Sequence, residues 1–272
     1  MPSPRKASPR KTGALKAPAI ELPVRDTHAG STIEELARRL RPELTPLNKQ
    51  FAWHPLFPIA EEDQRQYLQD PIESLPAAAL ALLPKIAVVL APYLEKGTGQ
   101  AGTIVVDTKP SEAKLALSAR VEGPGFATLF FTVKGEQVAD YHYFFYDELS
   151  ALLSHSWPKK TMDIWHALLR EELSAEIHGE VDERSWRQKQ ALLRRPMNAR
   201  RDGKPFREYA RQSFEDTMTL YLHGICCDID VDTGPRQLPS RCLRKRLELL
   251  KSLFPPPDGR GVFPEDLKEK RK

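Results

Sequence analysis

The chain has 272 residues, of which 40% are hydrophobic and 29% charged, and its formal net charge is +4. This composition supports a packed core and excludes a globally disordered chain. No stretch approaches the roughly 18 apolar residues of a membrane-spanning helix, and no signal-peptide segment is visible. The three cysteines include the neighbours Cys226 and Cys227 and do not suggest a disulfide framework. We therefore expect a soluble, cytoplasmic protein with no membrane partner.

The first 30 residues combine proline, serine and basic side chains without apolar periodicity. Ser3–Lys6 and Ser8–Lys11 both read Ser-Pro-Arg-Lys. Such a composition cannot build a core, so residues 1–30 are predicted to be a disordered basic arm. One folded domain is expected over 31–255, followed by a disordered basic tail over 256–272.

Short elements are expected in the first part of this domain. Ser31 and Thr32 precede a helix start that runs to about Leu40. A second helix is predicted over 76–83. The apolar runs 86–90 and 103–106 are typical of buried strands.

Apolar and polar residues alternate over three further runs, 114–121, 126–133 and 137–146. Glycine-containing turns join these runs, which predicts an antiparallel β-meander. The last run contains the aromatic segment Tyr141–Tyr146. We interpret this segment as a half-buried strand in preference to a base-stacking platform.

The second half of the domain is predicted to be mainly helical, so the expected fold class is α+β. Ser213 is expected to cap a short helix, and Ser240 the last helix of the domain. The prolines at 255–257 stop that last helix.

The strongest predicted helix covers residues 160–178 and has an apolar stripe that includes Trp165. Glu172 and Glu176 fall within this stripe. Carboxylates that face a core need partners, because burying an unpaired charge is unfavourable. Two interpretations stay open. The carboxylates either pair with arginines or are exposed in a cleft, or they form an altered metal site together with Glu215.

Lysine and arginine outnumber acidic residues between positions 184 and 211. The predicted binding residues of this basic segment are Arg194, Arg195, Arg200, Arg201 and Lys204. Such a cluster can hold a phosphate backbone electrostatically, which makes nucleic acid a candidate partner. The alternative interpretation is a solvated loop.

The segment Pro205–Leu222 resembles part of the zincin metallopeptidases of the anthrax lethal factor-like kind. In that family a Tyr-Ala pair precedes a helix that opens with Glu-Asp. The matching pairs here are Tyr209-Ala210 and Glu215-Asp216. The resemblance implies that Glu215 stands at the position of the third zinc ligand and Tyr209 at that of the tyrosine assisting the oxyanion. The spacing is about one residue shorter here, and the family's following Phe-Ala-Glu is replaced by residues 217–219.

The catalytic helix of that family carries H-E-x-x-H, whose histidines bind zinc while the glutamate activates water. The fitting helix here places Glu171 and Ala175 at the histidine positions and Glu172 at that of the general base. Alanine cannot bind a metal, so the resemblance implies a degenerate site, and neither zinc nor another cofactor is expected. Glu172 and Glu215 are expected to face one another across a cleft, with an arginine from 184–211 between them.

Other motifs are weaker. His223, Cys226 and Cys227 offer metal ligands, but adjacent cysteines lack the C-x-x-C spacing of a zinc knuckle. Neither a P-loop nor a G-x-S-x-G elbow is present, which disfavours P-loop nucleotide hydrolysis and hydrolase-type serine chemistry.

Three functions remain in view. The first is a catalytically inactive zincin-like domain that acts as a scaffold or binding module for a protein whose identity the sequence does not indicate. The second is a nucleic-acid-associated protein that uses the basic arm and the 184–211 segment. The third is an active enzyme with a carboxylate-rich metal site.

Overall fold

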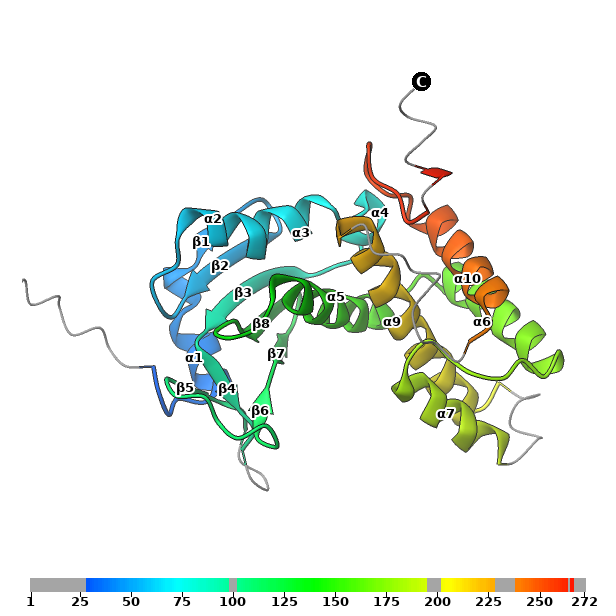
Figure 1. Cartoon of the computed structure of the whole chain (residues 1–272), viewed down its shortest axis with the longest axis horizontal. Helices are drawn as coiled ribbons and strands as arrows, with labels where there is room; N and C mark the ends of the chain where they lie inside the picture. Colours follow the sequence, from blue (N-terminus) through cyan, green and yellow to red (C-terminus); the bar gives the residue numbers. More distant parts are fainter. Residues whose placement is uncertain (1–27, 98–101, 195–201, 228–237, 264, 267–272) are drawn as a thin grey trace, which may run out of the picture.

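The computed structural model in Figure 1 describes residues 28–97, 102–194, 202–227, 238–263 and 265–266. Its strands are β1 (Thr45–Pro46), β2 (Phe51–Pro55), β3 (Lys85–Ala91), β4 (Tyr93–Glu95), β5 (Ile104–Val106), β6 (Leu115–Ala116), β7 (Ser118–Gly123) and β8 (Phe126–Thr132). Its longer helices are α1 (Ile33–Arg39), α5 (Val138–His155), α6 (Lys159–Ser174), α7 (Glu183–Leu193), α9 (Lys204–Cys227) and α10 (Ser240–Leu253). Its short helical segments are η1 (Arg41–Glu43), α2 (Glu61–Gln64), η2 (Arg65–Gln69), α3 (Asp70–Glu73) and α4 (Ala77–Leu80).

The main sheet has the strand order β1-β2-β3-β8-β7. β3 pairs in parallel with both β2 and β8, whereas β1–β2 and β7–β8 are antiparallel. The expectation of a mixed helix and strand protein is confirmed, but the predicted all-antiparallel meander is wrong apart from the β7–β8 hairpin. A second, smaller sheet has the order β5-β4-β6 and is antiparallel.

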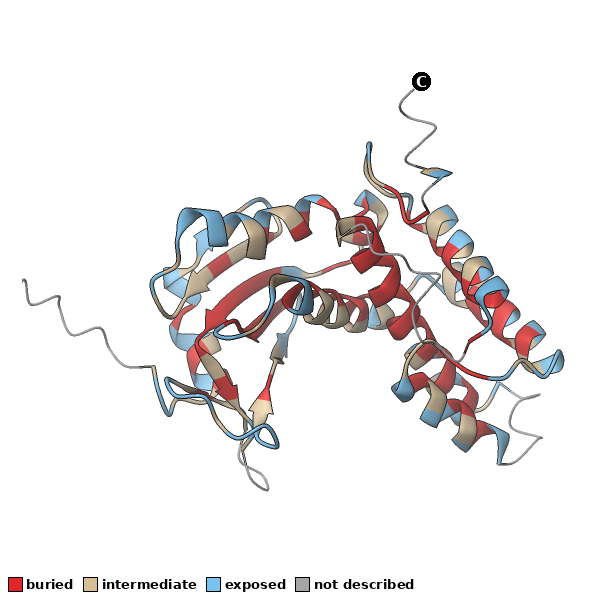
Figure 2. Ribbon diagram, in the orientation of Figure 1, coloured by how far each residue is buried: buried red, intermediate tan, exposed pale blue. Residues whose placement is uncertain are grey.

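The central strands are buried on both faces, which explains their continuous apolar sequence. On one face Val89 and Phe130 pack with Leu36 of α1. On the other face Val88 and Leu129 join the larger core, to which α5 and α9 contribute. Figure 2 shows this burial along β3, β8 and the inner helices.

The predicted first helix is confirmed as α1. The Thr32 side chain accepts a hydrogen bond from the backbone N–H of Glu35, and the Glu35 side chain bonds back to the backbone of Thr32. This reciprocal capping box satisfies N–H groups that the first turn would otherwise leave without partners. The predicted strand at 86–90 is confirmed as β3.

The predicted strand over 137–146 is wrong, because these residues open the helix α5. Tyr141, Phe145, Leu149 and Leu152 recur at helical spacing, and all four are buried. The aromatic segment is apolar in nearly every direction, so its short-range alternation fits a strand as well as a helix. Only the longer window to His155 distinguishes the two.

The short helix that Ser213 was expected to cap is instead the middle of α9, which has 24 residues. α9 contacts α5, α6, α7 and α10, and Figure 1 shows it between α5 and the outer helices. The hydroxyl groups of Thr217 and Thr219 donate to the carbonyl oxygens of Ser213 and Glu215, at 2.6 and 2.8 Å. These bonds satisfy polar side chains inside a buried helix.

The ends of three segments differ from their predictions. α6 ends at Ser174, and Glu176 is exposed with a positive φ of 53°, so it does not lie on the apolar stripe. α10 ends before the prolines as expected, but Val262 and Phe263 are buried, so the core extends beyond residue 255. The backbone N–H of Gly30 donates to Val105 at 2.8 Å, so the ordered domain begins before residue 31. Residues 1–27 of the predicted arm and 267–272 of the predicted tail lie outside the described residues.

No helix within the described ranges is both long and apolar enough to span a membrane.

Candidate functional site

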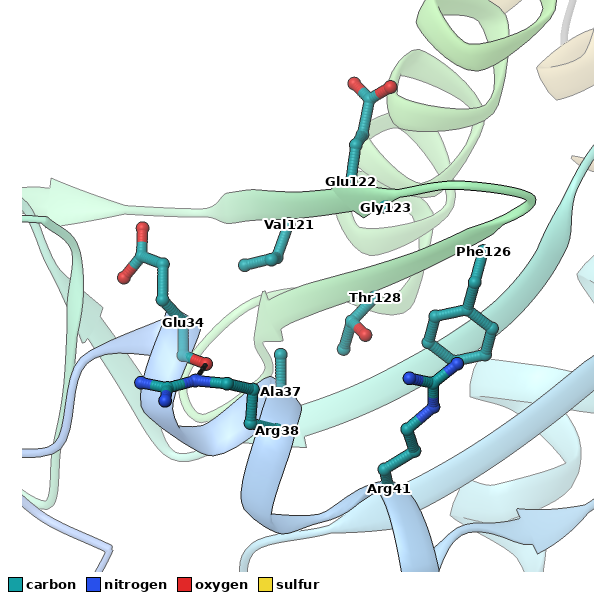
Figure 3. A pocket seen from close by; sticks show the side chains of 9 residues that line it. All are labelled: Glu34, Ala37, Arg38, Arg41, Val121, Glu122, Gly123, Phe126 and Thr128. Atoms are coloured by element: carbon teal, nitrogen blue, oxygen red, sulfur yellow. Dashed lines mark hydrogen bonds between the residues drawn. The ribbon is translucent and has the colours of Figure 1, made fainter.

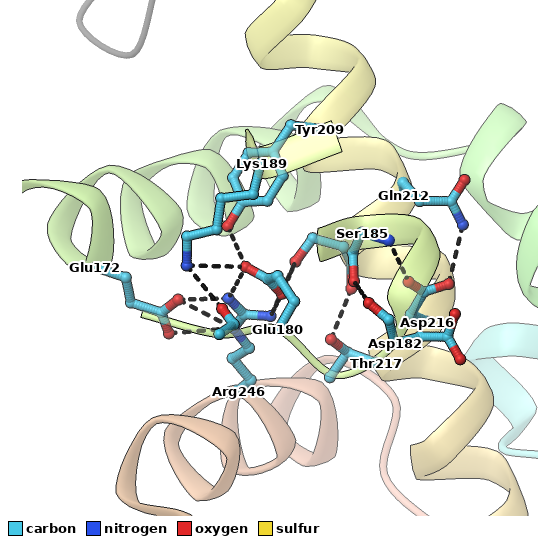
Figure 4. Close-up of polar contacts among 12 residues, drawn as sticks. Glu172, Glu180, Asp182, Ser185, Lys189, Tyr209, Gln212, Asp216, Thr217 and Arg246 are labelled. Atoms are coloured by element: carbon cyan, nitrogen blue, oxygen red, sulfur yellow. Dashed lines mark hydrogen bonds and ion pairs between the residues drawn. The ribbon is translucent and has the colours of Figure 1, made fainter. Parts of the chain in front are cut away.

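A buried ion network joins α6, α10 and the connector between α6 and α7. At its centre the guanidinium of Arg246 on α10 is fully buried. It donates to Glu172 of α6 at 2.5 Å and to Glu180 of the connector at 2.7 Å. Figure 4 shows both carboxylates directed at this one guanidinium. The planar fork of arginine suits such a double contact.

Glu180 is held by two further elements. The Tyr209 hydroxyl on α9 donates to the Glu180 carboxylate at 2.5 Å, and the ammonium of Lys189 on α7 lies 3.2 Å from it. Lys189 also donates to the carbonyl oxygen of Gly179 at 2.9 Å. The two buried carboxylates therefore face two buried cations, and the network is electrically balanced.

Burial and ion pairing have opposite effects on the pKa values of Glu180 and Arg246. Burial alone would raise the pKa of Glu180, but the charges and hydrogen bonds of Arg246, Lys189 and Tyr209 lower it to about 2. Burial raises the pKa of Tyr209 well above its ordinary value, and the neighbouring Glu180 adds to this effect. Burial would lower the pKa of Arg246, yet the two glutamates keep it well above its ordinary value. All three groups therefore keep one protonation state at neutral pH.

Trp165 fixes the position of α6 beside this network. Its indole N–H donates to the carbonyl oxygen of Ala210 on α9 at 3.1 Å. Its ring lies 5.9 Å from the Arg246 guanidinium carbon and makes an edge contact with Phe214. One side chain thus links the helix that carries Glu172 to the helix that carries Tyr209.

A small cleft of about 260 Å³ opens beside Glu172. Its lining includes the other two positions of the predicted catalytic motif, Glu171 and Ala175. At this cleft the ammonium of Lys245 pairs with Glu171 at 2.7 Å. The three motif positions are therefore close together, but two of them are engaged in ion pairs and the third is alanine.

Glu215 lies on a different face of α9 from Tyr209 and Ser213. It accepts a hydrogen bond from Ser154 of α5 at 2.6 Å, and Arg211 lies 3.9 Å away. Within the described part of the chain, Glu172 and Glu215 share no hydrogen-bond or ion-pair partner. The expected bridge between these two carboxylates is therefore not formed, because each contacts a different element. The structure instead brings Glu172 together with Tyr209, through Glu180 and Arg246.

The expected arginine bridge exists, but its source and its second acid differ from the prediction. The bridging residue is Arg246 of α10, and the second acid is Glu180. The 184–211 segment contributes Lys189. Glu180 was not recognised in the sequence because it lies in a connector without periodicity. The preceding Gly179, whose φ is 84°, did not indicate a functional residue either.

Part of the predicted basic segment neutralises acids of the same chain. Arg184 pairs with Asp147 and Asp216, and Lys204 lies 3.7 Å from Glu208. Arg194 is exposed at the end of α7. The predicted binding residues Arg195, Arg200 and Arg201 lie outside the described residues.

A second buried acid, Asp216, connects α7 to α9. It accepts hydrogen bonds from the Ser185 backbone N–H at 3.0 Å and from Gln212 at 2.9 Å, and Arg184 lies 3.0 Å away. Burial is the main cause that raises its pKa to about 6, while Arg184 opposes the shift. These contacts explain how a carboxylate is accommodated in the core at this position.

A third cluster lies at the C-terminal end of α9, where Cys226 and Cys227 meet His142 of α5. Their ligand atoms lie within 4.8 Å of one another. The hydrogen bonds from Cys227 and then from His142 lower the pKa of the Cys226 thiol to about 3. The sequence indicated the two cysteines but not His142, because its segment was assigned to a strand. His223 is not a member of the cluster.

A groove of about 330 Å³ lies between α1 and the β7–β8 hairpin, as Figure 3 shows. Val121 and Phe126 line it, and the Arg41 guanidinium lies 5.1 Å from the ring centre of Phe126. Glu34 and Arg38 bring opposite charges to the same groove. Its mixed charge does not identify a ligand.

Comparison with known proteins found no matching family model, no similar curated protein and no similar solved structure. The zincin-like resemblance therefore remains a prediction from the 205–222 segment.

Proposed function

We propose that the chain is a catalytically inactive zincin-like domain that acts as a scaffold or binding module for another protein. The observation that carries the proposal is the buried guanidinium of Arg246. It contacts both carboxylate oxygens of Glu172, at the general-base position, and it also binds Glu180. A general base needs a free oxygen within reach of the proton it removes. Glu172 is committed to an ion pair instead.

The helix that matches the family's zinc-binding helix carries no histidine at either ligand position. On α6 the two positions are Glu171 and Ala175. Alanine offers no ligand atom for a metal, and Glu171 pairs with Lys245. This placement of the resemblance therefore supports an inactive site.

The two other functions receive less support. A carboxylate-rich metal site would need Glu172, Glu176 and Glu215 to converge, whereas Glu176 is exposed and the other two contact different partners. The exposed Arg194 would be accessible to a nucleic-acid phosphate. However, Arg184 and Lys189 of the same segment already neutralise acids within the fold.

The test is peptide hydrolysis by the full chain with zinc added, with new termini read by mass spectrometry. We expect no cleavage in wild type or in the Glu172→Gln, Glu215→Ala and Glu183→Gln variants. Wild-type cleavage that Glu172→Gln or Glu215→Ala removes would overturn the proposal. In that case Glu183, which is exposed and lies outside the predicted motif, provides the matched control.

The nucleic-acid alternative is tested by fluorescence anisotropy with duplex DNA and single-stranded RNA. We expect no saturable binding at physiological salt. Binding that weakens steeply with salt and is reduced by Arg194→Ala would favour the alternative.

A further inference from the structure

We propose that His142, Cys226 and Cys227 form a binding site for a borderline-soft divalent ion of the zinc class. The three residues come from two helices that are packed along one another, α5 and α9. Two thiol sulfurs and one imidazole nitrogen are the donor set that zinc takes in proteins, with a fourth position left for water.

The distances between the donor atoms fit such an ion. His142 Nδ1 lies 3.1 Å from the Cys227 sulfur and 3.8 Å from the Cys226 sulfur. A tetrahedral ion with ordinary zinc–nitrogen and zinc–sulfur bonds separates these atoms by about 3.5 Å. The observed distances lie on either side of that value, so small side-chain rotations would complete the site.

The histidine is already oriented for metal binding. Its Nε2 lies 2.8 Å from the backbone carbonyl oxygen of Gln66. A carbonyl oxygen only accepts hydrogen bonds, so Nε2 carries a proton. Nδ1 faces the two thiols, and its lone pair becomes available to a metal ion when that nitrogen is deprotonated. Metal-binding histidines commonly have such a carbonyl partner on the second nitrogen, which fixes their tautomer and orientation.

The position of the cluster favours a cation and allows it to enter. Cys226 and Cys227 are the last two residues of α9, where the helix dipole is negative. Both cysteines are partly exposed, whereas His142 is buried. A bound ion would join the end of α9 to α5 and, through His142, to the η2 segment that carries Gln66. Such an ion would therefore hold these three elements together.

This site is separate from the predicted zincin-like position. Glu215 lies three helical turns before Cys226 on α9, and its partners are Ser154 and Arg211. Metal bound at either position can be distinguished by substitution, and the inference does not depend on the proposed function.

The experiment titrates Co²⁺ into the reduced, metal-stripped full chain and follows its absorption. We expect one equivalent to bind with a thiolate-to-cobalt charge-transfer band and tetrahedral visible bands, and Zn²⁺ to displace it. Cys226→Ser and Cys227→Ser should each weaken binding at least about tenfold. The matched control is Cys242→Ser, which changes the remaining, buried cysteine of the chain and should leave binding unchanged.

Circular dichroism shows whether each variant is folded. His142→Gln removes the nitrogen ligand and should also weaken cobalt binding. Three results would overturn the inference. The first is no saturable cobalt binding by the folded wild-type chain, including the case in which Cys226 and Cys227 only oxidise. The second is equal loss in Cys242→Ser. The third is loss in Glu215→Ala with full binding retained in Cys227→Ser, which would place the metal at the zincin-like position and contradict the proposed function too.

Discussion

Arg246 shows how a charged side chain is retained in the core of this domain. A guanidinium with no exposure would be unfavourable by itself, because its hydration is lost. Here Glu172 and Glu180 supply opposite charge, and Ser213 accepts a further hydrogen bond from the guanidinium at 2.9 Å. Lys189 balances the second carboxylate. The polar residues at the predicted catalytic positions are therefore explained by the stability of the fold.

Tyr209→Phe should lower the free energy of unfolding by about 1.5–3 kcal/mol, because it removes a hydrogen bond to a charged, buried carboxylate. Tyr221→Phe is a matched control, since the hydroxyl of this equally buried tyrosine donates to the neutral carbonyl oxygen of Phe254. Its expected loss is about 0.5–1.5 kcal/mol. Urea denaturation measures both. A larger loss for Tyr221→Phe would contradict the charged character of the network.

Glu180 makes the stability of the domain depend on acid pH. Its pKa is about 2 in the fold, against 4.5 for an ordinary glutamate. Between these values the unfolded chain binds more protons than the folded chain, so the stabilisation is complete above about pH 4.5 and is lost as the pH falls towards 2. In Glu180→Gln the unfolding free energy should fall less steeply over this window. An unchanged slope in urea titrations at several pH values would show that Glu180 is not ionised in the fold.

Local patterns predicted the elements whose environment is simple. The cap candidates Ser31 and Thr32 identified the start of α1, and the continuous apolar run of β3 identified a buried strand. α5 and α9 are surrounded by other elements, so their apolar residues point in several directions and hide the helical period. This is why His142 was placed in a strand and its meeting with Cys227 could not be foreseen.

The segment after α10 belongs to the packed domain. Val262 and Phe263 are buried, and the guanidinium of Arg244 lies 4.5 Å from the Phe263 ring centre. Deleting residues 256–272 should lower the melting temperature by on the order of 10 °C, since two apolar side chains leave the core. Deleting only 267–272 removes none of the described contacts and should change it by less than about 2 °C. If differential scanning calorimetry gives the same melting temperature for the two deletions, the domain ends at residue 255.

The described residues form a main sheet with helices on both faces, a smaller second sheet and a helical half gathered around α9, as Figure 1 shows. That the fold mixes helices and strands followed from the sequence. The parallel pairing of β3 with β2 and β8 did not, because it joins segments that are distant in the chain. The same holds for the ion network, whose members Glu172 and Arg246 are 74 positions apart. Their meeting depends on how α6 and α10 pack, and no local pattern encodes it.

The central claim is that Glu172 serves the fold through Arg246. A double-mutant cycle of Glu172→Gln and Arg246→Met, measured by urea denaturation, tests it most directly. Arg246→Met should lose about 3–5 kcal/mol, because it leaves two carboxylates buried with one cation. Arg246→Lys, which keeps the charge, provides a milder variant if the methionine variant does not fold. The double variant should be more stable than the sum of the single losses predicts, by at least about 1 kcal/mol. Additive losses, or an Arg246→Met variant as stable as wild type, would contradict the claim.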